Sequence, residues 1–471
     1  MMRAKTVSGQ LTVYVSLAFL LVMSFLLSGL ESARSRAAEA YFQMEADTQG
    51  SNLFSYYYRP LFDDYRLLFL ASQSPGGESA ETTASRLLLT AMEEQTGETF
   101  WPVDVLAVTP EDVVHGADFE GRAVEKEILD YMKYRSVPWI LEELIPALRQ
   151  MQEGENLREA VPENLELPQG ESPSQQEESP QVSARDQAEA LHFLEQANTF
   201  RRSGILGQVL SDTDELSGNG WTKEERDPES VQGNWDEGEC LFEADGGVPK
   251  AEALMTAAYF SDVLTSYTSP GRGTAAYEQE YLIGGEDSDA ENLKCAVRRL
   301  VIIREGLNLT ALYTMDSSRR AEASALAATI SMIPGLEPWE PVIELFILGV
   351  WAYAEALQDV RDLLAGGKVP LVKTAAEWRI EFAQMFSRKP VKTDGRGFSY
   401  ENYLMLLLLI RGSKDNVRRF MELTEIQFKT ADTDFRWENT IYKVDFAIDA
   451  QAPGIWRGAQ QTMYALVHRE Y

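Results

Sequence analysis

Two carboxylates on one predicted helix are the strongest candidates for chemistry in this sequence. Glu355 and Asp359 stand four residues apart in the apolar segment 340–364, so they share one helix face. A pair of carboxylates can perform general acid–base catalysis, but glycosidases hold theirs on opposite sides of a substrate, and one helix face lacks that geometry. We therefore interpret the pair as part of a structural ion pair, whose candidate partners are Arg304, Arg298 and Lys368. Arg304 lies inside an apolar stripe and needs such a partner.

A second acidic cluster lies on a loop before another predicted helix. Alternating carboxylates on a loop suit a hard cation such as Ca²⁺, but Asn292 stands where a calcium loop needs its central glycine, and Arg298 where it needs its distal glutamate. Acidic residues are also favoured at a helix N-terminus by the helix dipole, and Ser288 with Glu291 forms an S-x-x-E capping box. We interpret the cluster as the start of a helix; it comprises Glu286, Asp287, Asp289 and Glu291.

Other motifs of catalysis or ligand binding do not match. No metal-ligand spacing surrounds His115, His192 or His468. The segment AGGKVP fails as a phosphate loop because Asp362 replaces the first glycine and Val369 replaces the serine or threonine that would bind magnesium. We therefore predict no catalytic, cofactor or metal site and no enzymatic activity.

The elements that carry these residues predict a helix-dominated α+β fold. Residues 340–364 have only about 12 apolar residues before a charge, which is typical of a buried core helix and too short for a membrane span. The segment EYLIGG is predicted as a short strand and a turn before a long helix, and KVPLVKT as another short strand. KVDFAIDA and MYALVHREY alternate apolar and polar residues as half-buried strands do. We expect packed helices with a small C-terminal antiparallel sheet.

One segment near the N-terminus is long and apolar enough to cross a membrane. Leu11–Leu30 carries no charge, and about 20 helical residues span roughly 30 Å, the thickness of the hydrocarbon core. A cleaved secretory signal is the alternative, but its apolar core is about 7–15 residues long and small residues follow it, whereas Glu31 follows here. We favour an uncleaved transmembrane helix that continues outward as a helical stalk.

The charges beside this segment do not decide its orientation. Arg3 and Lys5 precede it, and Arg34 and Arg36 follow it, so the positive-inside rule is balanced. A short N-terminus before a long acidic chain favours residues 1–10 in the cytoplasm and the rest outside the cell. We thus expect a single-pass protein of the cell membrane.

The remainder divides into three predicted regions. Residues 31–150 form the stalk and a membrane-proximal domain, and residues 185–471 form an α+β extracytoplasmic domain. Between them, 151–184 contains four prolines, eight glutamates and no aromatic residue, which predicts a disordered acidic linker.

Charge and cysteine content restrict the partners and the compartment. A formal net charge of −31 repels a phosphate backbone, which excludes nucleic acid as a partner. Cys240 and Cys295 are compatible with one disulfide in an oxidising compartment, although we favour the alternative of two small buried residues.

Several segments together resemble a known family. It comprises membrane proteins of Gram-positive bacteria, is catalogued as a domain of unknown function, and is often encoded beside tight-adherence (Flp-type) pilus and secretion genes. The resemblance rests on SGQLTVYVSL, GLESAR, LFDDYRLLFL, EYLIGGEDSDAENL, RRLVIIREGLN, EALQDVRDLLAGGKVPLVKT and YENYLMLLLLI. Gly9 before the apolar helix and Glu31 at its end are also similar to the TadE/TadG class of pilin-like proteins, although the glutamate that a processed pilin carries near Tyr14 is missing. The resemblance implies a location and a pathway, but no activity of individual residues.

Two hypotheses for the function follow. The first is a non-enzymatic, pilin-like or accessory component of a tight-adherence pilus or secretion apparatus, whose apolar helix packs against other membrane helices. Small residues permit such close approach, here Ser16, Ala18, Ser24, Ser28 and Gly29, although a plain anchor is the simpler interpretation. The second is a surface module whose loops around Trp221 and Trp235 recognise a ligand or a surface polymer.

Overall fold

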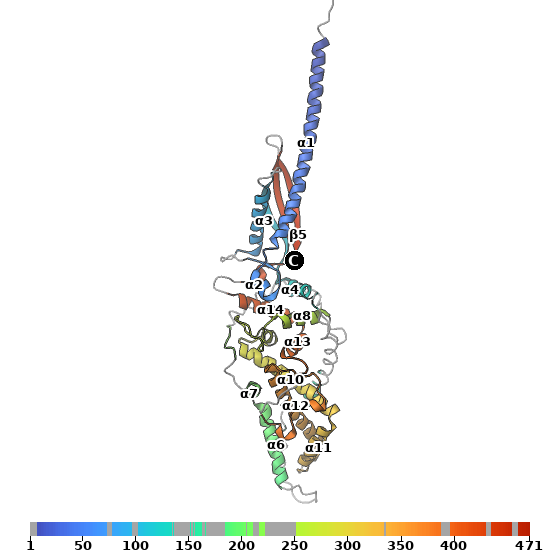
Figure 1. Ribbon diagram of the computed structural model, residues 1–471, viewed down its shortest axis with the longest axis vertical. Coiled ribbons are helices and arrows are strands. Elements are labelled where there is room, and N and C mark those ends of the chain that lie inside the picture. Colours follow the sequence, from blue (N-terminus) through green and yellow to red (C-terminus); the bar gives the residue numbers. More distant parts are fainter. Residues whose placement is uncertain are drawn as a thin grey trace, which may run out of the picture. The chain divides into compact units, whose positions relative to one another are not determined.

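The computed structural model shows a helix-dominated α+β protein with two compact units, which are described separately (Figure 1). Unit 1 contains the described parts of 1–127 and 428–471, and unit 2 those of 128–228 and 238–427. The structure describes short stretches between 135 and 165 and the ranges 7–72, 78–96, 102–133, 184–203, 205–210, 216–221, 251–333, 336–387, 396–429, 435–454 and 460–471.

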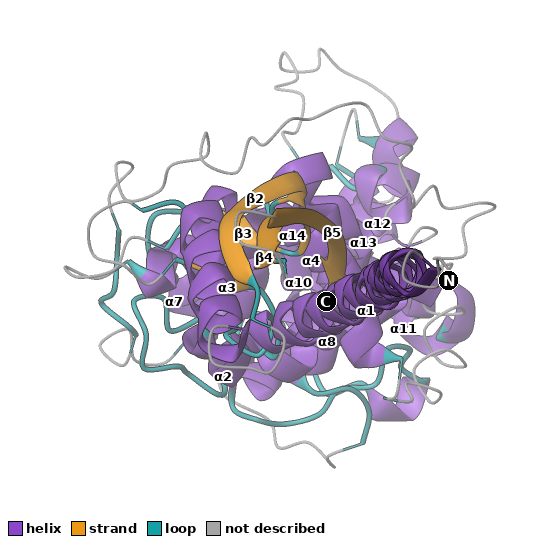
Figure 2. Ribbon diagram, turned by 90° about the horizontal axis from the view of Figure 1, so that it is seen from above, coloured by secondary structure: helices purple, strands orange, loops and turns teal. Residues whose placement is uncertain are grey.

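Unit 1 joins both ends of the chain around one antiparallel sheet. The strands β2 (Asp104–Val114), β4 (Lys443–Pro453) and β5 (Gln460–Glu470) lie in the order β2-β4-β5 and are drawn in orange in Figure 2. Strands β1 (Leu70–Ala71) and β3 (Thr440–Ile441) form a separate two-stranded antiparallel sheet. The helices of this unit are α1 (Val7–Leu53), α2 (Arg59–Tyr65), α3 (Ala80–Thr96) and the first part of α4 (Asp118–Met132).

Helix α1 has two halves with different surroundings. The half that follows Glu31 packs into the core of unit 1 through Ala38, Phe42 and Ala46, against α3 and the buried face of the sheet. Gly50 permits the closest contact, because a Cβ atom there would lie 2.6 Å from Cγ1 of Val467 on β5. The predicted continuation of the apolar helix into a helical stalk is therefore confirmed, and the stalk is part of a folded unit.

The turn between β2 and α4 depends on a glycine. A Cβ atom on Gly116 would lie 2.5 Å from the ring of the fully buried Trp437 and 2.7 Å from Oγ1 of Thr440. Thr440 Oγ1 also accepts a hydrogen bond from the Gly116 amide at 3.1 Å. Side chains larger than hydrogen cannot fit here without moving a packed indole ring.

We expect Gly116→Ala to lower the free energy of unfolding by about 1–2 kcal/mol, since forcing a methyl group into a packed core displaces its neighbours. Urea denaturation followed by tryptophan fluorescence measures the change. Gly29→Ala is the matched control, because nothing lies within 4 Å of the corresponding Cβ position. Equal midpoints for Gly116→Ala and the wild type would contradict the expected clash.

Unit 2 is a set of packed helices. Its centre is the pair α10 (Asp289–Met315) and α12 (Glu340–Leu364), against which α11 (Ser317–Ser331) packs. Trp351 of α12 is fully buried in this core. Further α-helices in the described part of this unit include α6 (Ala184–Arg202), α7 (Ile205–Val209), α8 (Ala251–Val263), α9 (Glu278–Gly284), α13 (Tyr400–Arg411) and α14 (Ser413–Phe428).

Two predicted helices of this unit are confirmed. Helix α10 begins after Ser288, whose hydroxyl accepts the Glu291 amide at 3.3 Å, which is the serine half of the predicted capping box. Helix α12 is buried over most of its length, as expected for a core helix.

Two predicted strands are wrong. EYLIGG forms the end of helix α9, which closes at Gly285 in the left-handed conformation (φ 70°). A short apolar run that is buried on all sides has no periodicity to separate a strand from a helix. KVPLVKT makes only an isolated bridge between Val369 and Phe398, because the carbonyls of Pro370 and Leu371 accept side-chain hydrogen bonds from Arg304.

The predicted domain boundaries also need correction. Strands β4 and β5 belong to unit 1, although the sequence assigned them to a domain of residues 185–471. The described residues in the first part of the predicted linker 151–184 are ordered, since Val161 and Leu165 are buried in the core of unit 2 and Arg158 pairs with Glu305 at 3.2 Å. Residues 166–183 of that linker lie outside the described residues.

Candidate functional site

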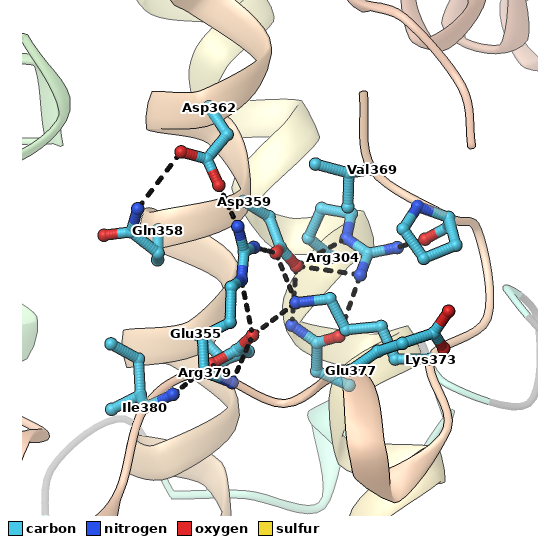
Figure 3. A network of polar contacts seen from close by, with 12 residues as sticks. Arg304, Glu355, Gln358, Asp359, Asp362, Val369, Lys373, Glu377, Arg379 and Ile380 are labelled. Carbon is cyan, nitrogen blue, oxygen red and sulfur yellow. Dashed lines mark hydrogen bonds and ion pairs between the residues drawn. The ribbon is translucent and has the colours of Figure 1, made fainter. Parts of the chain in front are cut away.

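The two carboxylates of α12 lie in a buried ion cluster of unit 2 (Figure 3). Helix α12 supplies the acids, α10 supplies one arginine, and the segment that follows α12 supplies two more basic residues. The cluster comprises Glu355, Asp359, Asp362, Arg304, Lys373 and Arg379. Three negative charges thus face three positive charges.

Arg304 is completely enclosed, and all of its guanidinium nitrogens are hydrogen-bonded. Its Nε and Nη2 donate to Oδ2 of Asp359 at 3.0 and 2.8 Å. Nη1 donates to the carbonyl oxygens of Pro370 and Leu371 at 2.9 and 2.7 Å and to the Tyr403 hydroxyl at 3.1 Å. This arginine therefore joins α10 to α12 and to the segment after it.

Glu355 and Asp359 bind side chains and one backbone amide of the segment that follows α12. Lys373 lies between them, with its Nζ 2.5 Å from Oδ1 of Asp359 and in contact with Oε1 of Glu355. Arg379 contacts all three acids of the cluster, and Oε2 of Glu355 also accepts the Ile380 amide at 2.9 Å. Every carboxylate oxygen of the cluster accepts at least one hydrogen bond.

The electrostatics of this cluster match a structural role. Burial alone would raise the pKa of Asp359, but Lys373, Arg304 and Arg379 hold that pKa well below its usual range. Burial raises the pKa of the Tyr403 hydroxyl to about 12. A general acid or base needs a pKa near the working pH and contact with a substrate, whereas Glu355 and Asp359 are enclosed and bound by protein donors. The cluster fastens residues 369–380 to α12 and α10.

The predicted ion pair is confirmed only in part. Arg304 is a partner of Asp359, as its position in an apolar stripe indicated. Arg298 and Lys368 are exposed and are not members of the cluster, so those two candidates are wrong. Lys373 and Arg379 were missed because they lie in irregular structure, where no periodicity indicates which side chains turn inward.

Two acids of the cluster before α10, Asp289 and Glu291, bind neighbouring protein groups. Asp289 is buried, and its carboxylate accepts the Ser217 hydroxyl at 2.6 Å and the amides of Ala276 and Tyr277. Glu291 is exposed and pairs with Lys294 at 3.1 Å. Within the described ranges, no three histidine, cysteine or acidic side chains come together in a way that could hold a metal ion.

Glu280 of α9 is a buried acid that the sequence did not single out. Its Oε1 accepts the Tyr267 amide at 2.9 Å and the Tyr400 hydroxyl at 2.8 Å. Its Oε2 is buried and has no hydrogen-bond partner among the residues that the structure describes. Burial raises the pKa of Glu280 to about 7. An acid directly before the apolar residues Tyr281, Leu282 and Ile283 was the available signal, and the incorrect strand assignment concealed it.

Of the two tryptophans proposed for ligand recognition, Trp221 offers no exposed ring. Trp221 is only 4% exposed and packs edge-on against Tyr281, so its ring belongs to the core of unit 2. Trp235 lies outside the described residues. Cys295 is half-buried with a free thiol and Cys240 lies outside the described residues, so the disulfide stays a prediction.

The other half of α1 is the largest exposed apolar surface in the parts of the chain that the structure describes. Apart from the half-buried Leu27, the large side chains from Leu11 to Leu30 are between 37% (Met23) and 79% (Phe25) exposed. Among the described helices, α1 alone is long and apolar enough to cross a membrane. Apolar surface of this extent requires a cover of lipid or of other helices.

A shallow groove follows one side of this exposed half. Ser24 and Ser28 lie in it between larger side chains, namely Leu20, Met23 and Leu27, and it continues to Glu31, Ser32 and Ser35. The Ser24 hydroxyl donates to the Leu21 carbonyl at 2.8 Å, so its polarity is already satisfied within the helix. Ser16 and Ala18, which were also proposed for helix contact, do not line this groove.

Comparison with known proteins gives one family. A search of curated proteins and a search of solved structures found no match. A model described as a family of unknown function (DUF5702) matches residues 183–452, from the start of α6 to the end of β4. Because this match covers more than half of the 471 residues, the chain belongs to the DUF5702 family, whose function is unknown.

Proposed function

We propose that this protein is a non-enzymatic, membrane-anchored component of a tight-adherence pilus or secretion apparatus, either pilin-like or accessory. In this proposal Leu11–Leu30 crosses the cell membrane once, with the N-terminus inside and the acidic units outside. Its contacts with other apparatus proteins are made by α1.

The observation that carries the proposal is the continuity of α1. One helix of 47 residues provides both the exposed apolar half and the core packing of unit 1. A plain anchor needs no such rigid connection, since a flexible linker would hold a domain at the membrane equally well. A subunit whose membrane helix packs in a defined assembly does need it, because its folded unit must keep a fixed orientation to that helix.

The groove around Ser24 and Ser28 supports the same proposal. Helices associate in membranes through close van der Waals packing, which small residues permit. Leucine at both positions would fill the groove but keep the segment apolar enough to insert. Leucine at Ser16 and Ala18 makes a comparable change outside the groove, so it is a matched control.

Co-purification from gently solubilised native membranes tests this function. We expect the wild-type chain and the Ser16→Leu/Ala18→Leu variant to recover pilus or secretion proteins, and we expect Ser24→Leu/Ser28→Leu to lose most of that recovery. A chain with Leu11–Leu30 replaced by an unrelated leucine-rich span should lose it entirely. Carbonate extraction verifies that every variant is still inserted. Recovery by none of the chains, or by all of them alike, would contradict the proposal.

A further inference from the structure

The end of the unit 1 sheet that lies beside the exit of the apolar segment forms a small cavity. Its volume is about 70 Å³. Helix α1 contributes Glu31, Arg34 and Ser35, and the sheet end contributes Pro102, Gln460 and Gln461. All of these residues belong to unit 1, so their arrangement is that of one compact body.

The height of this cavity above the apolar segment follows from helix geometry. At 1.5 Å per residue, Glu31, Arg34 and Ser35 lie about 2, 6 and 8 Å beyond Leu30 along the helix axis. The headgroup region of each leaflet is about 5–8 Å thick, which is half the difference between the whole bilayer and its hydrocarbon core. Helix α1 is unbroken from Val7 to Leu53, so the height of the cavity is fixed by the position of the apolar segment.

The side chains around the cavity suit a phospholipid headgroup. Arg34 is half-buried and forms no ion pair with a described residue, so its guanidinium is available to a phosphate. The hydroxyl of Ser35 and the amide of Gln461 add hydrogen-bond donors, and the Glu31 carboxylate can accept from the ammonium group of a zwitterionic lipid.

We propose that this end of unit 1 rests in the phospholipid headgroup layer, with Arg34 bound to a lipid phosphate in the cavity. The inference depends on the membrane anchoring in the proposed function and adds a second contact with the bilayer. Two contacts, one through α1 and one through the sheet end, hold unit 1 against the membrane surface, where the helix alone would leave its tilt free.

Depth-dependent quenching of a fluorescent label tests this contact. The full chain, with Cys240→Ser and Cys295→Ala, is reconstituted in vesicles of phosphatidylethanolamine and phosphatidylglycerol and labelled at one introduced cysteine. Gln460→Cys marks the sheet end. Leu466→Cys is the matched control, since it lies on the same face of β5, exposed, and about 20 Å further along the strand. Ser24→Cys reports insertion of α1.

We expect a lipid with a nitroxide on its headgroup to quench the Gln460→Cys label severalfold more than the Leu466→Cys label. Arg34→Gln should reduce this difference, whereas Arg36→Gln should leave it unchanged, because Arg36 is exposed and does not line the cavity. Equal quenching at the two β5 positions, with the Ser24→Cys label quenched by an acyl-chain nitroxide, would overturn the headgroup contact alone. An unquenched Ser24→Cys label would overturn both this contact and the anchoring on which it depends.

Discussion

Asp359→Asn is expected to lower the free energy of unfolding by about 3–5 kcal/mol, because removing one member of a buried ion cluster leaves uncompensated charge. The amide keeps the size of the carboxylate, but Arg304, Lys373 and Arg379 then face only Glu355 and Asp362. Urea denaturation of the detergent-solubilised chain measures the change. Trp351 is a suitable fluorescent probe, since its Nε1 donates to the Ile380 carbonyl at 2.7 Å beside the cluster.

Two further variants make this experiment specific. Asp130→Asn removes the acid of an exposed ion pair with Lys133, so it should change the stability by no more than about 0.5 kcal/mol. Adding Lys373→Met to Asp359→Asn removes one surplus positive charge and should restore part of the loss, because neighbouring sites are not additive. A loss below about 1 kcal/mol for Asp359→Asn would show that the cluster contributes little.

The acid dependence of stability gives the same cluster a second readout. The folded-state pKa of Asp359 is lowered, so its contribution to stability is present above the unfolded pKa of about 3.9 and is lost as the pH falls toward the folded value. The wild type should therefore lose more stability below pH 4 than Asp359→Asn does.

Glu280→Gln is expected to raise the free energy of unfolding by about 3–4 kcal/mol at pH 8 and by only about 1 kcal/mol at pH 5. Burial raises the pKa of Glu280 to about 7, so the folded protein binds a proton there that the unfolded chain has released. Stability then falls as the pH rises from the unfolded value of about 4.3 to about 7. A neutral amide removes this cost and can still accept from Tyr267 and Tyr400.

Denaturation of the wild type and the variant between pH 5 and pH 8 measures this effect. Glu291→Gln is the control, because Glu291 is exposed in the neighbouring helix α10. Parallel stability curves for wild type and Glu280→Gln over that range would exclude titration of Glu280. The charge of Asp289 also raises the pKa of Glu280, and Asp289 is present in both the wild type and the Glu280→Gln variant.

The sequence predicted those features that local chemistry determines. An uncharged run of about 20 residues defines α1 by length alone, and a serine before an acidic first turn defines the start of α10. Arg304 was identified as needing a partner because a charge in an apolar stripe must be compensated. In each of these cases the residues that give the signal lie within a few positions of the structural feature that they predict.

Features that depend on distant residues could not be predicted. Strand β2 contains Pro110 and many exposed side chains, so it lacks the alternation of β4, and its pairing with β4 joins distant parts of the chain. Lys373 and Arg379 enter the ion cluster from irregular structure, and no pattern in the sequence gives the direction of such side chains. The order of residues 156–162 and of Leu165 comes from packing against α10 and α12, which overrides the acidic composition of this segment.

The pairing of β2 with β4 also has a consequence for biosynthesis. Between Val114, where β2 ends, and Lys443, where β4 begins, the ribosome must add 443 − 114 = 329 residues. At about 5–20 residues per second, β2 waits roughly 15–65 s for β4, and the face of α1 that packs on the sheet waits longer, while the helices of unit 2 can already fold. During this interval an unpaired strand edge and an apolar helix face of the nascent chain are open to aggregation.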